Sequence, residues 1–501
     1  MSLARTGTFT FSGVEAVPVE VQVQIASGLP AFTIVGLPNK AVNESRERVR
    51  AALATVGVAL PPKRVLVNLA PADLTKDGSH FDLAVAVAIL AAMDIIPRER
   101  AQDCSVMGEL ALDGRILDVP GILPAALQAA STGRTLVCPL AQGGEASWAG
   151  ARGVVAAPDL AALVGHLRGT ALLPPPPVPA PAEQDPVPDL ADIRGHATAR
   201  RVLEIAAAGR HNLLLVGPPG SGKSMLAARL PGLLPPLSPG EALEVSVVQS
   251  LGGLLASGRI PTRRPFRAPH HSASQAALIG GGSRMRPGEV SLAHRGVLFL
   301  DELPEFSRAA LEALRQPMET GEAVISRAVG TAVFPAQFQL VAAMNPCRCG
   351  SLGITGKECS RAPGCGGEYR EKVSGALLDR IDLVVEMLPI PPRDLVRAEP
   401  GEASAVVARR VAAASDASVR RGGTFNSEAP LDRLRSWADA DAIALLERAA
   451  ERLGLSSRGV LRTLRVARTI ADLSGEARTL SRHVAEALAY RSRSFLPAVP
   501  R

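Results

Sequence analysis

A phosphate-binding loop carries the most specific chemistry in the sequence. Residues 217–224 read GPPGSGKS and match the pattern G-x-x-x-x-G-K-[ST], between an apolar strand at 212–216 and a helix expected at 224–230. In this pattern the glycines turn backbone N–H groups toward phosphate oxygens, the lysine reaches the β- and γ-phosphates, and the final hydroxyl binds Mg²⁺. The expected ATP-binding residues are Gly217, Pro218, Pro219, Gly220, Ser221, Gly222, Lys223 and Ser224, with Ser224 as a magnesium ligand.

Two further apolar strands each lead to polar residues that suit triphosphate hydrolysis. The first, at 297–300, ends in Asp301 and Glu302, about 80 residues after the loop. We expect Asp301 to hold Mg²⁺ with the loop hydroxyl and Glu302 to polarise the attacking water. The second, at 339–343, leads to Asn345, whose amide can orient the same water, although Asn-Pro is also an ordinary turn signal.

Two arginines are candidates for stabilising transition-state charge. Arg380 lies in LLDRID, where it either forms a buried ion pair with Asp379 or Asp382 or acts as an arginine finger on the γ-phosphate of a neighbouring subunit. Arg458 begins a helix near the C-terminus and is expected to contact the nucleotide from a lid. The expected catalytic set is Lys223, Asp301, Glu302, Asn345, Arg380 and Arg458.

Four of the six cysteines crowd into one glycine-rich loop, at Cys347, Cys349, Cys359 and Cys365. The loop has little apolar content to bury, so four thiolates around a structural Zn²⁺ would explain how it is ordered. The C-x-C spacing is tighter than the usual C-x₂₋₄-C, and reduced thiols or a redox disulfide are the alternatives. Cys104 and Cys138 are expected to be buried as apolar residues.

A proline-rich stretch divides the chain. Residues 172–190 contain eight prolines, which predict an extended linker. Strand and helix signals alternate before it, and strands typical of a buried parallel sheet follow it. The expected units are 1–171, 172–190, an α/β core at 191–392, and an Arg-rich helical part at 393–501. The expected elements include strands at 17–25 and 64–69, helices at 43–56, 81–93, 197–208, 440–453 and 458–473, and hairpins at 106–117 and 321–334.

Composition narrows the class of protein. The chain has 501 residues, of which 47% are hydrophobic and 21% charged, an ordinary globular composition. We expect a cytoplasmic protein, because no signal peptide is recognisable and the longest apolar run, at 83–93, is too short to span a membrane. The net charge is +7, and residues 391–501 carry 19 Arg against 13 acidic residues, which favours a polyanionic partner. Aromatic residues are only 3%, which argues against a base-stacking surface.

Several segments together resemble one known family. They are GHATARRVLEIAAAGRHNLLLVGPPGSGKSMLA around the phosphate loop, FRAPHHSAS, RGVLFLDELPEF, MNPCRCG and SGALLDRIDL. In combination they resemble Mg-chelatase-like AAA+ ATPases of the ComM/YifB type, over essentially the whole chain. The resemblance implies an α/β AAA+ P-loop core, a helical C-terminal lid domain and an N-terminal Lon-protease-like α+β domain. It also implies a hexameric ring that uses ATP and Mg²⁺ for DNA branch migration or helicase activity in natural transformation.

The resemblance also marks where DNA would touch the ring. A hairpin at 321–334 would point into the ring channel, which makes Arg327 a candidate DNA contact, although a salt bridge is equally compatible. Arg462, on the C-terminal helix, is a second candidate, and Arg465 and Arg468 are expected on the surface or facing DNA. The paired His270 and His271 have no third metal ligand nearby and are interpreted as structural or polymer-facing.

The N-terminal part departs from Lon-like proteases, which use a Ser–Lys dyad. Matching Asp77-Gly78 to the protease pattern puts His80 where the nucleophile should be, and the later stretch 108–130 contains no lysine. A serine without a base is not activated, so we expect no proteolysis. Two alternatives to a DNA motor remain: a motor subunit of a magnesium chelatase, and a protein-remodelling ATPase.

Overall fold

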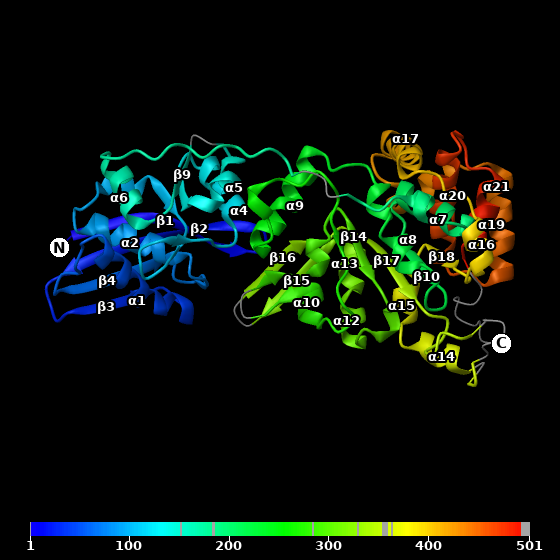
Figure 1. Cartoon of the computed structure of the whole chain (residues 1–501), viewed down its shortest axis with the longest axis horizontal. Helices are drawn as coiled ribbons and strands as arrows, with labels where there is room; N and C mark the ends of the chain where they lie inside the picture. Colours follow the sequence, from blue (N-terminus) through cyan, green and yellow to red (C-terminus); the bar gives the residue numbers. More distant parts are fainter. Residues whose placement is uncertain are drawn as a thin grey trace.

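Three parts lie in a row along an elongated molecule, with the N-terminal residues at one end and the C-terminal helices at the other (Figure 1). The computed structural model describes residues 2–150, 153–182, 186–282, 285–327, 330–352, 359–361 and 364–491. Among these residues no helix is both long and apolar enough to cross a membrane.

The N-terminal part is built on a seven-stranded mixed sheet in the order β3-β4-β2-β1-β5-β8-β9. In β2, alternate residues are buried, as the period-2 pattern predicts. The strands are β1 (Ser2–Ser12), β2 (Glu15–Ala26), β3 (Ala31–Val35), β4 (Arg64–Ala70), β5 (Cys104–Val106), β8 (Thr135–Pro139) and β9 (Val154–Ala157). The helices are α1 (Lys40–Thr55), α2 (Phe81–Ala92, buried throughout), α3 (Arg98–Gln102), α4 (Ile122–Ser131), α5 (Gly143–Ser147) and α6 (Leu160–Arg168).

The hairpin expected at 106–117 is shorter than predicted. Only β6 (Glu109–Leu110) and β7 (Ile116–Leu117) pair, and Val106 belongs to β5 of the main sheet. The interruption falls at Gly108, whose N–H donates to the His80 carbonyl, 3.1 Å away, and whose carbonyl accepts from Leu83 N, also 3.1 Å away. These bonds fasten the chain to the first turn of α2 and take Gly108 out of any ladder.

The proline-rich segment has no helix or strand among its described residues up to 189 and runs along the surface past α5 (Figure 1).

Buried polar contacts also fix the N-terminal part to α9 (Pro239–Gly252) of the core. Ser250 Oγ lies 2.5 Å from a Glu145 oxygen, and the Ser250 carbonyl accepts from Gly121 N at 3.0 Å. Burial raises the pKa of Glu145. The two parts are therefore joined by a packed interface as well as by the linker.

The core contains a five-stranded parallel sheet in the order β11-β14-β17-β10-β18. Every residue of β10, β14 and β17 is buried, as continuous apolar strands predict. The strands are β10 (Leu213–Val216), β11 (Phe266–Arg267), β14 (Val297–Leu300), β17 (Gln339–Met344) and β18 (Leu383–Glu386). Because all five are parallel, their carboxyl ends share one edge.

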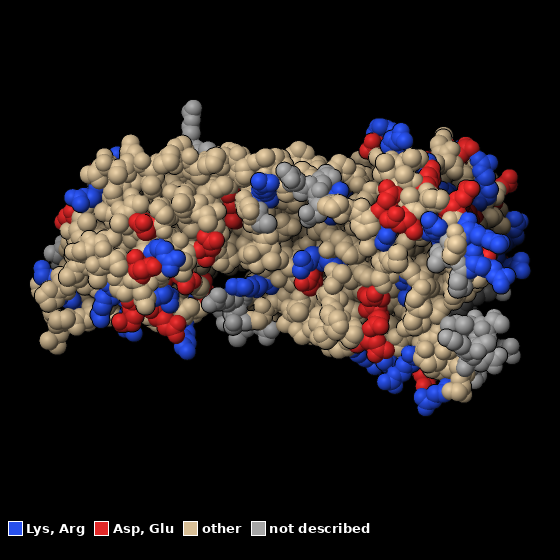
Figure 2. Space-filling model, viewed as in Figure 1, with Lys and Arg blue, Asp and Glu red and all other residues tan. Residues whose placement is uncertain are grey.

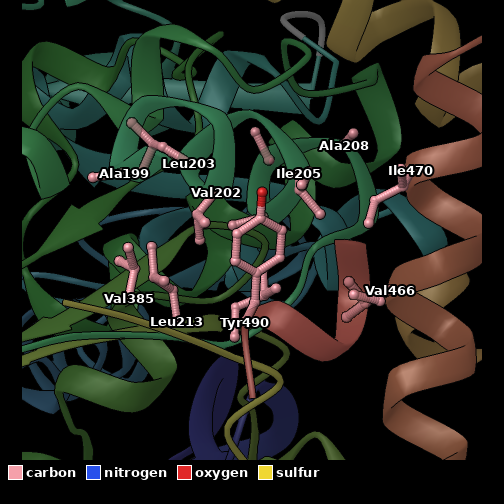
Figure 3. Close-up of a cluster of buried hydrophobic side chains, with 14 of the residues drawn as sticks. Ala199, Val202, Leu203, Ile205, Ala208, Leu213, Val385, Val466, Ile470 and Tyr490 are labelled. Carbon is pink, nitrogen blue, oxygen red and sulfur yellow. The ribbon is translucent and has the colours of Figure 1, made fainter. Parts of the chain in front are cut away.

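Helices cover both faces of this sheet. One face packs against α7 (Ala197–Gly209) and C-terminal helices, in a cluster that includes Leu213, Val466 and Tyr490 (Figure 3). The other face packs against α10 (Gln275–Ile279), α11 (Glu289–Leu292), α12 (Arg308–Ala313), α14 (Gly364–Glu371) and α15 (Gly375–Leu378). Next to them lie α13 (Arg315–Thr320), the short hairpin β12 (Gly280–Gly281) and β13 (Arg286–Pro287), and the longer hairpin β15 (Glu322–Arg327) and β16 (Gly330–Pro335).

The C-terminal part is helical, as predicted. After α16 (Pro392–Arg397) it contains α17 (Ser404–Gly422), α18 (Leu431–Ser436), α19 (Ala440–Leu453), α20 (Ser457–Leu473) and α21 (Ser481–Ala489). The expectation that three arginines on α20 face outward is wrong. Arg462 pairs with Asp382 at 2.7 Å, Arg465 Nε donates to the Ala429 carbonyl at 3.0 Å, and Arg468 is fully buried.

The two terminal nitrogens of the buried Arg468 guanidinium both donate to nearby acceptors. They donate to Asp472 at 2.8 Å and to the Ala477 and Glu476 carbonyls at 3.1 and 2.5 Å. A row of arginines three residues apart is typical of a solvated helix face. Here the turn after α20 folds back over Arg468, and Arg462 and Arg465 bind Asp382 and the Ala429 carbonyl, so all three side chains bind protein groups.

Candidate nucleotide-hydrolysis site

The phosphate loop joins β10 to α8 (Lys223–Ala227) at the carboxyl edge of the sheet. Gly220 and Gly222 have φ of 78° and 86°, a left-handed conformation that glycine adopts without steric cost. A Cβ at Gly217 would lie 2.4 Å from the Met387 carbonyl oxygen, so no larger residue fits there. The loop therefore depends on its glycines, as the motif predicts.

Lys223 is folded back onto the loop. Its Nζ donates to the Gly217 and Pro218 carbonyls at 2.7 and 2.9 Å and to Asn345 Oδ1 at 3.2 Å, and only 8% of the residue is exposed. Burial lowers the pKa of Lys223, and the nearby carboxylates of Asp301 and Glu302 oppose that effect. Phosphate oxygens at this position would offer the ammonium group the negative charge that the carbonyls lack.

The side chains of Asp301 and Ser224 lie side by side, as expected of two ligands of one Mg²⁺ ion. Ser224 Oγ lies 2.6 Å from Asp301 Oδ2. A hydroxyl and a carboxylate are the oxygen ligands that Mg²⁺ uses alongside phosphate. A cavity of about 380 Å³ opens here, and its lining includes Gly220, Lys223, Ser224, Asp301, Glu302 and Asn345. These residues suit a magnesium–triphosphate complex, in which Mg²⁺ would neutralise phosphate charge.

Glu302 stands at the end of β14 with φ 52°, a strained backbone for a glutamate. Strained backbone conformations of this kind are found most often at functional sites. The Glu302 N–H donates to Asp301 Oδ1 at 2.9 Å, and half of the Glu302 side chain is exposed in the cavity.

Asn345 follows β17, which lies directly beside β10, so the Asn345 amide lies next to the phosphate loop. The structure thus brings together Lys223, Ser224, Asp301, Glu302 and Asn345.

Arg380 and Arg458 do not line this cavity. Asn212, which precedes β10, donates to the Arg380 carbonyl at 2.9 Å, so Arg380 lies at the amino edge of the sheet. The four-residue strand, at about 3.3 Å per residue, separates that edge from the phosphate loop. Arg458 lies beside Arg380, because both contact Glu319 at the end of α13, Arg458 at 3.8 Å.

Two expectations are therefore corrected. The ion-pair partner of Arg380 is Glu319, because Asp382 is already occupied by Arg462 and by the Asn212 N–H at 2.8 Å. Arg458 does not contact the nucleotide site of its own chain, since α20 begins at the amino edge of the sheet. Burial would raise the pKa of Asp382, but His211, Arg462 and the Asn212 N–H lower it to about 2.

The structure places one of the two candidate DNA contacts, Arg462, in an internal ion pair and describes only the backbone of the other, Arg327. Arg462 is 16% exposed and engaged with Asp382, so the structure places it in an internal ion pair and not on a DNA-facing surface. Arg327 ends β15 opposite Gly330, as the predicted hairpin requires. The side chain of Arg327 lies outside the part of the chain that the structure describes.

The four cysteines converge. The Sγ atoms of Cys347, Cys349, Cys359 and Cys365 all lie within 4.8 Å of one another, and three of the four residues are buried. Cys104 and Cys138 are buried elsewhere, as expected, and burial raises the pKa of the Cys104 thiol to about 11. The loop also packs on the phosphate loop, because a Cβ at Gly350 would lie 2.5 Å from Pro219 Cδ.

The sequence did not indicate that two histidines, His271 and His196, lie at this site. His271 Nδ1 lies 3.2 Å from Glu302 Oε2. His196 hydrogen-bonds to the backbone of Ser221 in the phosphate loop, and burial lowers its pKa. Residue spacing gives no signal for this contact of His271, because only the strand order shows that β11 lies beside β14.

The strand order and the site together define a class of protein. β17 lies between the strand that enters the phosphate loop and the strand that ends in two carboxylates, and a helical part follows the sheet. This is the architecture of AAA+ P-loop ATPases.

Comparisons with known proteins identify the family. The family described as magnesium chelatase, subunit ChlI, matches residues 189–395, and its C-terminal family matches residues 401–491. Subunit ChlI of Mg-chelatase matches residues 21–142. The competence protein ComM of Haemophilus influenzae is 44% identical over 503 residues, which cover 98% of each chain.

Protein YifB of Salmonella typhimurium is 42% identical over 496 residues, covering 98% of this chain and 97% of that protein. The magnesium-chelatase 67 kDa subunit of Chlorobaculum parvum is 26% identical over only 203 residues, covering 40% of this chain and 26% of that protein. The chain belongs to the ComM/YifB family of Mg-chelatase-like AAA+ ATPases.

Glu302→Gln should bind ATP normally but hydrolyse it about 10²–10⁴-fold more slowly, because only the carboxylate that polarises water is lost. Lys223→Ala, as the matched comparison, should lose ATP binding itself. Binding of a fluorescent ATP analogue and phosphate release measure the two effects, and normal turnover in Glu302→Gln would contradict the assignment.

Proposed function

We propose that this chain is the subunit of an ATP-driven ring motor that moves DNA strands, by branch migration or helicase activity, in recombination during natural transformation. The observation that carries the motor assignment is the division of the hydrolysis machinery between two edges of one sheet. Lys223, Asp301 and Glu302 occupy the carboxyl edge, and Arg380 and Arg458 the amino edge. A ring of subunits, which we take to be a hexamer, would join one edge to the next.

Charge and relatedness support DNA as the substrate. Arginines gather over the C-terminal helices, with acidic residues among them (Figure 2). The exposed arginines there include Arg433, Arg435, Arg448, Arg452, Arg478 and Arg482. Phosphate backbones favour such surfaces. The relative ComM is named a competence protein and matches along its whole length, whereas the chelatase subunit matches only part of this chain.

We infer a division into a Lon-protease-like, non-proteolytic unit (1–171), a linker (172–190), the ATPase core (191–392) and a helical lid (393–501). Hydrogen bonds in the N-terminal part support the loss of proteolysis. Lys76 is buried and donates to the Pro71 carbonyl, while Ser79 donates to Glu109. His80 Nε2 lies 2.9 Å from the Phe9 carbonyl. Each side chain is thus engaged by a group other than a catalytic partner.

The proposed function is tested by ATP turnover with different polymers. Branched DNA should stimulate turnover several-fold, more than single-stranded or duplex DNA, and the protein should migrate a labelled three-strand junction only with hydrolysable ATP. Glu302→Gln provides the hydrolysis-deficient control. Stimulation by unfolded protein alone would support a remodelling ATPase, and stimulation by a porphyrin with its partner subunits would support a chelatase motor.

We further propose that Arg380 acts on the nucleotide bound by the next subunit, with Arg458 beside it. The sheet separates both side chains from their own phosphate loop. Arg380 is 5% exposed and held by Glu319 and the Ala376 carbonyl, 2.5 Å away. Glu319, which is half exposed, supplies the negative charge that a neighbour's γ-phosphate would supply in the ring. A guanidinium fork suits both partners.

Arg380→Ala should keep ATP affinity and lose most turnover, by about 10³–10⁵-fold if it resembles fingers in GTPases. Mixing it with Lys223→Ala protein should restore part of the activity, because a mixed ring pairs an intact loop with an intact finger. Thermal denaturation checks that both variants fold. Failure of mixing to restore activity, in rings shown to exchange subunits, would make Arg380 a structural residue.

We propose that the four-cysteine cluster holds one structural Zn²⁺. Four sulfur atoms within 4.8 Å of one another suit a single tetrahedral ion. The prediction is about one zinc per purified chain, and removal by a chelator should weaken ATP binding because Gly350 packs on Pro219. Cys359→Ser should lose the metal, whereas Cys104→Ala should retain it. Metal analysis that finds no zinc, with all six thiols freely titrating or a disulfide formed, would overturn the proposal.

A further inference from the structure

The four-cysteine loop and the helix that follows it adjoin all three segments that carry the hydrolysis residues. The loop begins after Asn345, which follows β17. A Cβ at Gly350 would lie 2.5 Å from Pro219 Cδ, so the loop packs on the phosphate loop. The helix is α14, whose second residue, Cys365, is one of the four clustered cysteines. This helix extends the contacts of the cysteine cluster to the turn that follows Glu302.

Close packing fixes the start of α14 to the cysteine loop. A Cβ at Gly366 would lie 2.8 Å from Leu352 Cδ2 and 3.3 Å from the Pro346 carbonyl oxygen, so the helix and the loop are in direct contact. The Leu352 N–H in turn donates to Cys347 Sγ at 3.3 Å. Both Cys347 and Cys365 are buried. The position of α14 therefore depends on how the cysteine cluster is held.

Tyr369 lies one turn further along α14, and its hydroxyl donates a hydrogen bond to the Glu305 carboxylate. The residue is 3% exposed and packs in the hydrophobic cluster that contains Leu300 and Leu303. Burial raises the pKa of the Tyr369 phenol, and the nearby carboxylates of Glu305 and Glu302 raise it further. The hydroxyl therefore keeps its proton and remains a hydrogen-bond donor.

Glu305 ends the 3₁₀ turn Leu303–Glu305, which directly follows Glu302. The Glu305 N–H donates to the Glu302 carbonyl at 2.8 Å. Glu302 has φ 52°, and such a conformation persists only where surrounding contacts hold it. Two side chains hold the far end of the turn: Tyr369, and Lys372, whose Nζ lies 3.5 Å from a Glu305 oxygen. The backbone of Glu302 is thus supported from α14 and the residue that follows it.

We propose that Tyr369 is a positioning residue for ATP hydrolysis, which holds the turn behind Glu302, and that the four-cysteine cluster fixes the helix that carries it. This inference rests on the hydrolysis step of the proposed function and adds a role for the cluster in turnover. Half of the Glu302 side chain is exposed, so its direction depends mainly on its backbone. A small misplacement of a catalytic group lowers the rate without changing what binds.

The chain supplies a matched control, because it contains two tyrosines and both donate to a glutamate. The Tyr490 hydroxyl lies 3.1 Å from Glu486 Oε1, in the C-terminal helical part, and Tyr490 is buried as well. Tyr369→Phe and Tyr490→Phe each remove one hydroxyl and keep the ring, so they should lower the melting temperature by similar amounts. Only Tyr369→Phe alters the support of the turn after Glu302.

The experiment measures kcat and KM for ATP without DNA, together with binding of a fluorescent ATP analogue. Tyr369→Phe should lower kcat about tenfold, since a hydrogen bond to a charged group is lost, and should leave KM and ATP binding unchanged. Tyr490→Phe should keep the wild-type kcat. Cys359→Ser, which opens the cluster, should also lower kcat at saturating ATP, and adding Tyr369→Phe to it should lower kcat little further.

The outcomes separate this inference from the proposed function. Turnover that no DNA stimulates contradicts a motor on DNA, while kcat without DNA still tests Tyr369. An unchanged kcat in Tyr369→Phe, or an equal loss in Tyr490→Phe, overturns the positioning role. Losses from Cys359→Ser and Tyr369→Phe that multiply independently overturn the link to the cluster. If Cys359→Ser fails to fold, Leu352→Ala, which loosens the contact between the loop and α14, takes its place in this comparison.

Discussion

The Asp382 carboxylate holds together the three elements on which the site depends. It accepts from the Asn212 N–H where β10 begins, it lies at the start of β18, and it binds Arg462 of α20 at 2.7 Å. Removing one partner of a buried pair costs about 3–5 kcal/mol, because the other charge is left unpaired. The strand that leads into the phosphate loop and the C-terminal helices are thus fixed to one buried charge.

That arrangement has a functional consequence. Because α20 is anchored at the amino edge of the sheet, the helix places Arg458 beside Arg380 and away from its own phosphate loop. The phosphate loop and the two carboxylates after β14 thus lie at one edge of the sheet, and both arginines lie at the other. Glu319 is the carboxylate partner of both arginines within the chain, of which Arg380 is buried and Arg458 exposed.

The loops around the phosphate site connect it to the rest of the molecule. The cysteine loop packs against Pro219, and the segment after β11 carries His271 to Glu302. The β15–β16 hairpin is held in turn by the N-terminal part, since Phe11 and Val14 pack against the cluster that contains Ile325 and Phe334. Movement of the hairpin would therefore disturb its packing against the N-terminal part.

The sequence by itself determined the features that depend on local geometry. The phosphate loop, the carboxylates after β14 and the apolar strands follow from residue type and spacing, because a glycine turn or a buried strand imposes its pattern on neighbouring residues. The tertiary structure alone decided where distant charges meet. From the sequence alone Arg468 is expected on the surface, but the turn at 476–479 encloses it. His271 lies near Glu302 only because β11 lies beside β14 in the sheet. Pairings of this kind depend on strand order and helix docking, which residue spacing does not encode.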